Sequence, residues 1–318
     1  MPCRYDRADT QMNYRKRTLM GMSDNKKRNI TRLIMIAVST LFVAAMLVMP
    51  LFMVIINALR KGISFYLKAI STPTVISAFK VTLIATVITL IVNTFFGITA
   101  SILLTRYSFR GKHILQTLID IPFSISPVIA GLSFIMLFGG MGWAAPALNA
   151  INEMLGLNIR IVFAIPGVVL ATIFVTFPFV SREIIPVLNA VGSDEEEAAS
   201  LMGADIFTIF RKITFPHMKW ALFYGMVLTT ARALGEFGAV NALSKTRGET
   251  FTLPLEIDAL YLSGSADSIV AAFAVSSVLV LCTIVILILR CIVEGKSKMN
   301  ASDRDKTGKL SEGIGYVP

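Results

Sequence analysis

From Val81 to Leu104 the sequence reads VTLIATVITLIVNTFFGITASILL, a run of 24 residues without a charged side chain. A helix crosses the hydrocarbon core of a bilayer with about 20 apolar residues, at about 1.5 Å per residue. Backbone N–H and C=O groups find no water there, so the segment must be a helix or a strand of a closed barrel. Because the run lacks the apolar-polar alternation of a barrel strand, it predicts a membrane-spanning helix.

Five further apolar runs have a similar length: Leu33–Ala58, Ile114–Phe138, Ile161–Val180, Met218–Val240 and Ile269–Leu289. The first is too long for the core of a cleaved signal peptide. Hydrophobic residues make up 55% of the chain and charged residues 16%, against about 25% charged in soluble domains. The sequence therefore predicts an all-α membrane protein with about six transmembrane helices.

The positive charges are distributed unevenly between the two sides that six spans define. The N-terminal tail, loops 105–113 and 181–219 and the stretch 290–318 together hold 22 Lys and Arg, whereas the alternate loops hold six. The positive-inside rule then places both termini in the cytoplasm. This distribution explains the net charge of +10, so nucleic acid is not expected as a partner.

The same pattern divides the chain into three parts. Residues 1–32 form a basic cytoplasmic tail, residues 33–293 a transmembrane permease domain, and residues 294–318 a polar cytoplasmic tail with a composition typical of disorder. Neither an enzyme nor a metal site is expected. His113 and His217 are far apart in the sequence, and the three cysteines, Cys3, Cys282 and Cys291, lack metal-ligand spacing.

Loop 181–219 is long for a connection between spans and should contain structure. Ser193 and Glu196 have capping-box spacing, which predicts the start of a helix. Gly203 should break or bend that helix, and a second apolar stretch should end at Pro216. The helix carries a small apolar face made of Ala198, Ala199, Leu201 and Met202. Such a helix suggests docking into a partner's groove. The alternative is a helix lying on lipid, which the acidic cluster disfavours because the inner leaflet is anionic.

The spacing within this loop resembles the EAA loop of bacterial ABC-importer permeases. Glu197, Ala198 and Ala199 are followed after three residues by Gly203, and after nine more by Ile213-Thr-Phe-Pro216. The family has Leu where this chain has Phe215, which is a conservative apolar change. The resemblance implies an ABC type-I importer permease with a MetI-like bundle, and a coupling loop over residues 193–216. Its ATPase-coupling residues would be Glu196, Glu197, Ala198, Ala199, Gly203, Ile213 and Pro216.

Further stretches narrow the resemblance to the sulfate/thiosulfate permeases of the CysW-type family. They are Asp120–Gly131, Thr176–Pro186 and Arg247–Leu255. A further stretch, Ala231–Val240, resembles sulfate and molybdate permeases alike. The resemblance implies import of sulfate or thiosulfate, with an ABC ATPase dimer, a second CysT-type permease and an extracytoplasmic sulfate-binding protein as partners. No cofactor is expected on this chain, and ATP would be hydrolysed by the ATPase. A molybdate or tungstate importer of the same architecture is the alternative.

Charged and polar residues inside the predicted spans are candidates for the translocation path. Arg232 and Glu236 lie four residues apart and share one helical face. They would either attract an oxyanion or form an ion pair that supports packing. Ser124 and Ser126 stand between two prolines and would either line a cavity or mark an ordinary kink. An ion-coupled secondary transporter would need midplane carboxylates and inverted repeats, which the sequence does not show, and it would leave the coupling loop unexplained.

Overall fold

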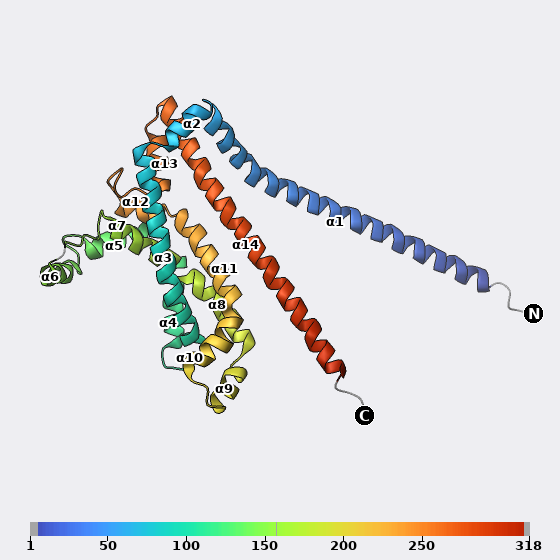
Figure 1. The fold of residues 1–318 in the computed structure, drawn as a ribbon. Coiled ribbons are helices and arrows are strands. Elements are labelled where there is room, and N and C mark those ends of the chain that lie inside the picture. The colour runs from blue at the N-terminus through green and yellow to red at the C-terminus, as the bar shows by residue number, and fades with distance from the viewer. Residues whose placement is uncertain (1–5, 157, 315–318) are drawn as a thin grey trace, which may run out of the picture. The chain divides into compact units, whose positions relative to one another are not determined.

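The computed structural model describes residues 6–156 and 158–314, so Cys3 lies outside the described residues. Within those ranges every regular element is a helix (Figure 1). The chain divides into two units, residues 1–56 and residues 57–318. Helix α1 (Asp6–Leu59) begins in the first unit and ends just inside the second, and it runs through the predicted basic tail and the first apolar run without a break. Its segment Thr31–Leu59 is long and apolar enough to cross a membrane.

The second unit contains the remaining helices. They are α2 (Ile63–Ile70), α3 (Pro73–Arg106), α4 (Lys112–Ser124), α5 (Pro127–Phe138), α6 (Ala145–Leu155), α7 (Ile165–Thr176), α8 (Pro178–Val191), α9 (Asp194–Leu201), α10 (Ile206–Ile209), the π-helix η1 (Phe210–Thr214), α11 (Phe215–Leu234), α12 (Gly238–Leu243), α13 (Leu253–Leu262) and α14 (Ala266–Ile314). The α14 helix extends through the tail with a disorder-like composition, so that expectation was wrong for the described part.

Four segments of the described chain are long and apolar enough to span a membrane: Thr31–Leu59, Pro73–Arg106, Ile165–Val191 and Ala266–Leu289. The third predicted span is broken at Ile125–Ser126, where α4 and α5 meet at a bend of 110°, and it makes a fifth if the pair counts as one span. The break follows from Pro127, because a proline disfavours helical geometry in the residue before it. The fifth predicted run forms α11 and part of α12, and the charges in it leave α11 less apolar than the others.

Helices α3, α8 and α11 pack closely together around Val180. A Cβ atom at Gly97 would lie 2.7 Å from the Cβ of Val180, and one at Gly225 would lie 2.9 Å from its Cα. Small residues let membrane helices approach to this degree. A buried apolar cluster of Val180, Ile184, Leu188, Met218 and Leu222 continues the contact toward the end of α3 that carries Arg106.

The other layers surround this core. Helices α5, α7 and α12 share a cluster around Ala171, Val175, Ala239 and Leu243. Helices α3, α13 and α14 meet around Val75, Leu253 and Val275. Figure 1 shows α9 and α10 at one end of this unit and α2 and α13 at the other. The predicted coupling loop therefore lies at the opposite end of α3 from α13.

Candidate functional site

The predicted helix of the coupling loop exists as α9, and its first turn consists of acidic residues, Asp194 to Glu197. Negative charge is favoured at a helix N-terminus. The capping box predicted for Ser193 and Glu196 does not form, so that prediction is wrong. Ser193 has φ −112° and ψ −2°, outside the extended region of an N-cap, and its side chain makes no cap hydrogen bond. Its hydroxyl instead donates to Oε1 of Glu197 at 2.6 Å.

Gly203 ends the helix as the sequence predicted. Its φ of +85° is left-handed, a conformation that glycine adopts without the penalty of a side chain. The chain then turns, and the Ala204 N–H donates to the Ala199 carbonyl at 3.0 Å. Asp205 begins α10, and a hydrogen bond from the Thr208 hydroxyl holds the pKa of the Asp205 carboxyl below its ordinary value.

Pro216 does not end the second apolar stretch. It lies in the first turn of α11, and the chain is helical from Ile206 to Leu234 through the π-helix η1. A proline removes one backbone donor and crowds the carbonyl four residues earlier. The wider π turn over Phe210–Thr214 accommodates that loss. Ile213, another predicted coupling residue, lies half-buried within η1.

Four large apolar side chains on both sides of the Gly203 turn are strongly exposed. Leu201 is 90% exposed, Met202 82%, Ile206 81% and Phe207 69%. We call these four residues the apolar knob. Ala198 is also exposed, whereas Ala199 is buried and attaches α9 to the fold. A compact exposed apolar group next to an acidic helix is typical of a surface that binds another protein.

The three glutamates of α9 have three different partners. Glu195 pairs with His217 at 2.9 Å. Glu196 pairs with Arg106, the last residue of α3, with Nε and Nη2 donating to its two carboxylate oxygens at 2.8 and 3.0 Å. Glu197 is exposed and accepts a hydrogen bond from its near neighbour Ser193.

An open groove of about 780 Å³ lies beside this ion pair, between the end of α3 and the α9 to η1 segment. Its lining combines polar groups of Arg106, Glu196 and Glu197 with apolar groups of Ile206 and Phe210. The groove and the apolar knob share Ile206 and Phe207, so they form one continuous surface.

Arg232 and Glu236 form the ion pair that the sequence suggested, with 2.6 Å between Nη1 and Oε2. Glu236 is 1% exposed, and its Oε1 accepts a hydrogen bond from the Ala239 N–H at 2.9 Å, which caps the start of α12. The Arg232 side chain remains 33% exposed. Glu236 therefore stabilises the turn between α11 and α12, while Arg232 reaches the surface of this chain.

The structure brings the turn between α11 and α12 beside the break between α4 and α5. A Cβ atom at Gly238 would lie 3.0 Å from Cβ of Pro127 and 3.4 Å from the backbone N of Val128. Ser124 and Ser126, on either side of that break, are exposed. Two interruptions of membrane-associated helices thus lie next to each other.

Two ion pairs differ from what the sequence suggested. The position of Asp120 near the start of the third apolar run would allow it to pair with Arg106 or Arg110 of the preceding loop, but in the structure it accepts a hydrogen bond from Nε of Arg182 at 2.8 Å. The Arg182 guanidinium also lies over the Phe123 ring, 4.4 Å from its centroid. Arg182 thus ties α8 to α4.

The second pair was missed. Glu256 on α13 is fully buried and accepts three hydrogen bonds from Nε and Nη2 of Arg247, at 2.7 to 3.1 Å. Thr74 on α3 donates to the same carboxylate at 2.9 Å. These hydrogen bonds raise the pKa of Arg247 above its ordinary value. Arg247 begins one of the stretches that resemble the sulfate permeases. Nine residues separate it from Glu256, and this spacing predicts no contact between the two side chains.

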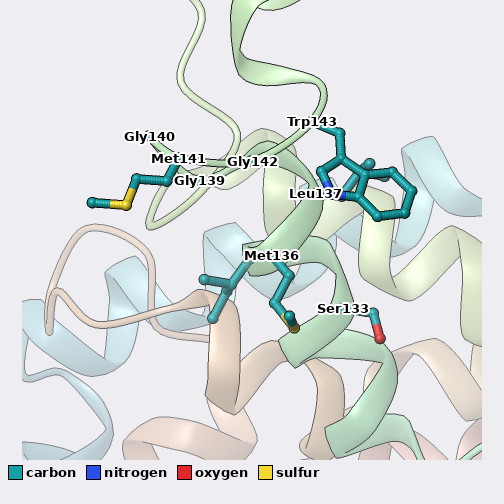
Figure 2. Close-up of a pocket in the computed structure, with 9 residues that line it drawn as sticks. Ser133, Met136, Leu137, Gly139, Gly140, Met141, Gly142 and Trp143 are labelled. Carbon is teal, nitrogen blue, oxygen red and sulfur yellow. The ribbon is translucent and has the colours of Figure 1, made fainter.

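A pocket of about 730 Å³ lies at the end of α5 and the turn after it (Figure 2). Its lining includes Met136, Met141 and Trp143 and three glycines, and contains no charged side chain. Figure 2 shows Met141 projecting away from the end of the helix. Trp143 is 91% exposed, which suits a residue at a membrane interface better than an anion site.

The chain matches known proteins along most of its length. The family described as "Binding-protein-dependent transport system inner membrane component" matches residues 94–298. A sulfate transport system permease protein CysW of Synechococcus elongatus is 40% identical over 284 residues, 89% of this chain and 95% of that protein. A sulfate transport system permease protein CysT of Salmonella typhimurium is 36% identical over 202 residues, 64% of this chain and 71% of that protein.

Among solved structures, a bacterial alginate ABC transporter in complex with an alginate pentasaccharide-bound periplasmic protein has a chain with the same fold. The TM-score is 0.69 at 17% identity, over 86% of this chain and 96% of that chain. The all-α, MetI-like fold class is thereby confirmed, and the relatives confirm that the chain is a transport permease subunit rather than an enzyme. The chain belongs to the family of inner membrane components of binding-protein-dependent transport systems, as a permease of the CysW type.

Proposed function

We propose that this chain is a membrane-spanning subunit of an ATP-driven importer that moves sulfate or thiosulfate across the cytoplasmic membrane. The CysW relatives, which align over nearly all of their own length, support this cargo. Molybdate or tungstate, tetrahedral oxyanions of the same charge, are the alternative cargo. The expected permease pairing with a CysT-type subunit is supported by the related CysT sequence.

The observation that carries the proposal is the apolar knob beside the acidic α9. A buried docking position would remove Leu201, Met202, Ile206 and Phe207 from water, at about 25 cal/mol per Å² of apolar surface. An ABC ATPase of the importer, present as a dimer that binds and hydrolyses ATP, is the proposed occupant. Glu197 and Ala198 are exposed next to the knob and would contact the ATPase with it.

The proposed orientation places both termini, and therefore α9, in the cytoplasm where the ATPase works. The excess of Lys and Arg in the segments on that side supports this orientation. An extracytoplasmic sulfate-binding protein would deliver the anion to the opposite side. Membrane lipid would cover the exposed apolar faces of the spanning helices.

The proposed translocation path runs past the neighbouring helix breaks. Arg232 would attract the oxyanion, and Ser124 and Ser126 would offer hydroxyl groups. The partial exposure of Arg232 and the exposure of both serines support this assignment. Glu236 serves packing in this proposal, because it is buried and caps α12.

Uptake of labelled sulfate into proteoliposomes tests the proposed function. The complex is reconstituted with its ATPase, with ATP inside the vesicles and binding protein outside. We expect uptake that requires both and that falls in Glu197→Arg, with Arg160→Glu on the opposite side of the membrane as the matched charge-reversal control. Excess unlabelled molybdate that abolished sulfate uptake would favour the alternative cargo. Uptake that continued without ATP would contradict the proposal in favour of an ion-coupled transporter.

A further inference from the structure

The α9 helix is attached to the membrane core by very little apolar surface. Of its eight residues only Ala199 is buried. The turn 202–205 that follows includes the left-handed Gly203 and leads into the exposed residues of α10. If a partner moves α9, the apolar contacts of this helix alone give the movement a weak path into α3 and α8.

The Arg106–Glu196 ion pair is the strong connection. The Arg106 side chain is 11% exposed and the Glu196 side chain 16%, so water screens this pair less than the exposed Glu195–His217 pair, whose carboxylate is 64% exposed. The two parallel N–H···O bonds also fix the relative orientation of both side chains, which a single contact does not.

Arg106 reaches a second helix through its third nitrogen. Nη1 donates to the carbonyl of Leu188 in the last turn of α8 at 3.0 Å. Arg106 itself ends α3, so the guanidinium stands at the C-terminal ends of two helices, where the helix dipoles favour a cation. Leu188 is fully buried in the cluster that joins α8 to α11.

Glu196 connects α9 to the π-helix η1. It stands in the first turn of α9, where the dipole favours an anion, and its Oε1 also accepts a hydrogen bond from the buried Thr214 of η1 at 2.9 Å. One partly buried ion pair thus joins α3, α8, α9 and the π-helix that leads into α11.

We infer that Arg106 and Glu196 are positioning residues that transmit movement of α9 into α3, α8 and α11, and that Glu196 is not a docking residue. This inference rests on the proposed function, in which an ATPase docks on the apolar knob. The two glutamates then have different roles, because Glu197 is exposed and can contact the ATPase, whereas Glu196 is bound to Arg106. Without the pair, α9 would follow the ATPase while the spanning helices lagged behind.

The test compares Arg106→Gln and Glu196→Gln with the wild-type complex in proteoliposomes. Arg110→Gln is the matched control, since it removes an exposed arginine four residues further along. Three quantities are measured: ATPase retained on the purified permease, ATP hydrolysed, and sulfate taken up. We expect retention and hydrolysis near wild type, and a loss of uptake per ATP of roughly tenfold or more, within the usual range for coupling between sites. The exchange variant Arg106→Glu with Glu196→Arg should recover part of the loss.

Each result counts for or against the inference. Uptake per ATP at the wild-type value in both variants would overturn it. So would loss of the ATPase from both variants, because the pair would then serve docking, or failure of both to accumulate in the membrane, because it would then serve folding. A wild-type complex without ATP-dependent uptake would instead contradict the proposed function, so the two failures are distinguishable.

Discussion

Replacing Arg247 by Ala should destabilise the fold far more than replacing Glu256 by Gln, although both changes break the same ion pair. Glu256 is fully buried, whereas the Arg247 side chain is 44% exposed. In Arg247→Ala a buried carboxylate keeps only the Thr74 hydroxyl, and an uncompensated buried charge costs about 3–5 kcal/mol. In Glu256→Gln the guanidinium can turn to water and the amide oxygen still accepts a bond, so the cost should be about 1 kcal/mol.

The assay is the heating of detergent-solubilised complex that carries a fluorescent protein fused to this chain, followed by size-exclusion chromatography. We expect Arg247→Ala to lower Tm by roughly 5–15 °C, since each kcal/mol shifts Tm by about 2–4 °C in chains somewhat shorter than this one. The double variant Arg247→Ala with Glu256→Gln should regain most of the loss, because it buries no charge. A double variant no more stable than Arg247→Ala, or a larger loss of stability in Glu256→Gln, would contradict a cost that comes from the unpaired buried carboxylate.

The Arg247–Glu256 pair also predicts how the stability of the fold depends on pH. The pKa of Arg247 is raised by its hydrogen bonds to Glu256. A cation whose pKa is raised on folding contributes stability that is present below its unfolded pKa and is lost only as pH rises through the folded value. Both values for an arginine lie far above neutrality. The contribution of this cation should therefore stay constant between about pH 6 and pH 9, in the same assay.

Two further substitutions test packing and capping. Gly225→Ala should lower the free energy of unfolding by about 1–3 kcal/mol, because the new Cβ would lie 2.9 Å from Cα of Val180. Gly235→Ala is the control and should change stability little, because the nearest neighbour of its Cβ would be 3.8 Å away. Equal Tm values for the two variants would contradict this packing. Glu236→Ala should lower the free energy of unfolding by about 2–3 kcal/mol, because it leaves Arg232 and the N–H at the start of α12 without their partner. Glu236→Gln should recover at least the hydrogen bond to the Ala239 N–H. An alanine variant as stable as wild type would contradict the capping role.

Features of the fold that depend on local sequence were predictable. An uncharged run such as Val81–Leu104 specifies a spanning helix by length and composition alone, and it lies within α3. The acidic first turn and Gly203 likewise set the bounds of α9, because dipole and backbone preferences act within one or two turns. The resemblance of the loop to a family motif rested on spacing within the same short segment.

Pairings between distant helices were not predictable in this way. Asp120 meets Arg182 rather than Arg106 because α4 packs beside α8, and Arg106 is already held by Glu196 and the Leu188 carbonyl. Residue spacing along the chain contains no information on such contacts, which depend on how closely the helices approach. The roles of Glu196 and Glu197 could be separated only after Arg106 was placed.

Site-specific photocrosslinking shows whether the apolar knob docks on an ATPase. A photoreactive amino acid is placed at Met202, which is 82% exposed, in cells that assemble the complex, with a second probe at Trp143 as an exposed apolar control. We predict that the Met202 probe gives an adduct of this chain with the ATPase whose yield changes with nucleotide, and that the Trp143 probe gives none. Adducts with lipid alone at Met202, or no adduct with the ATPase in any nucleotide state, would contradict the account.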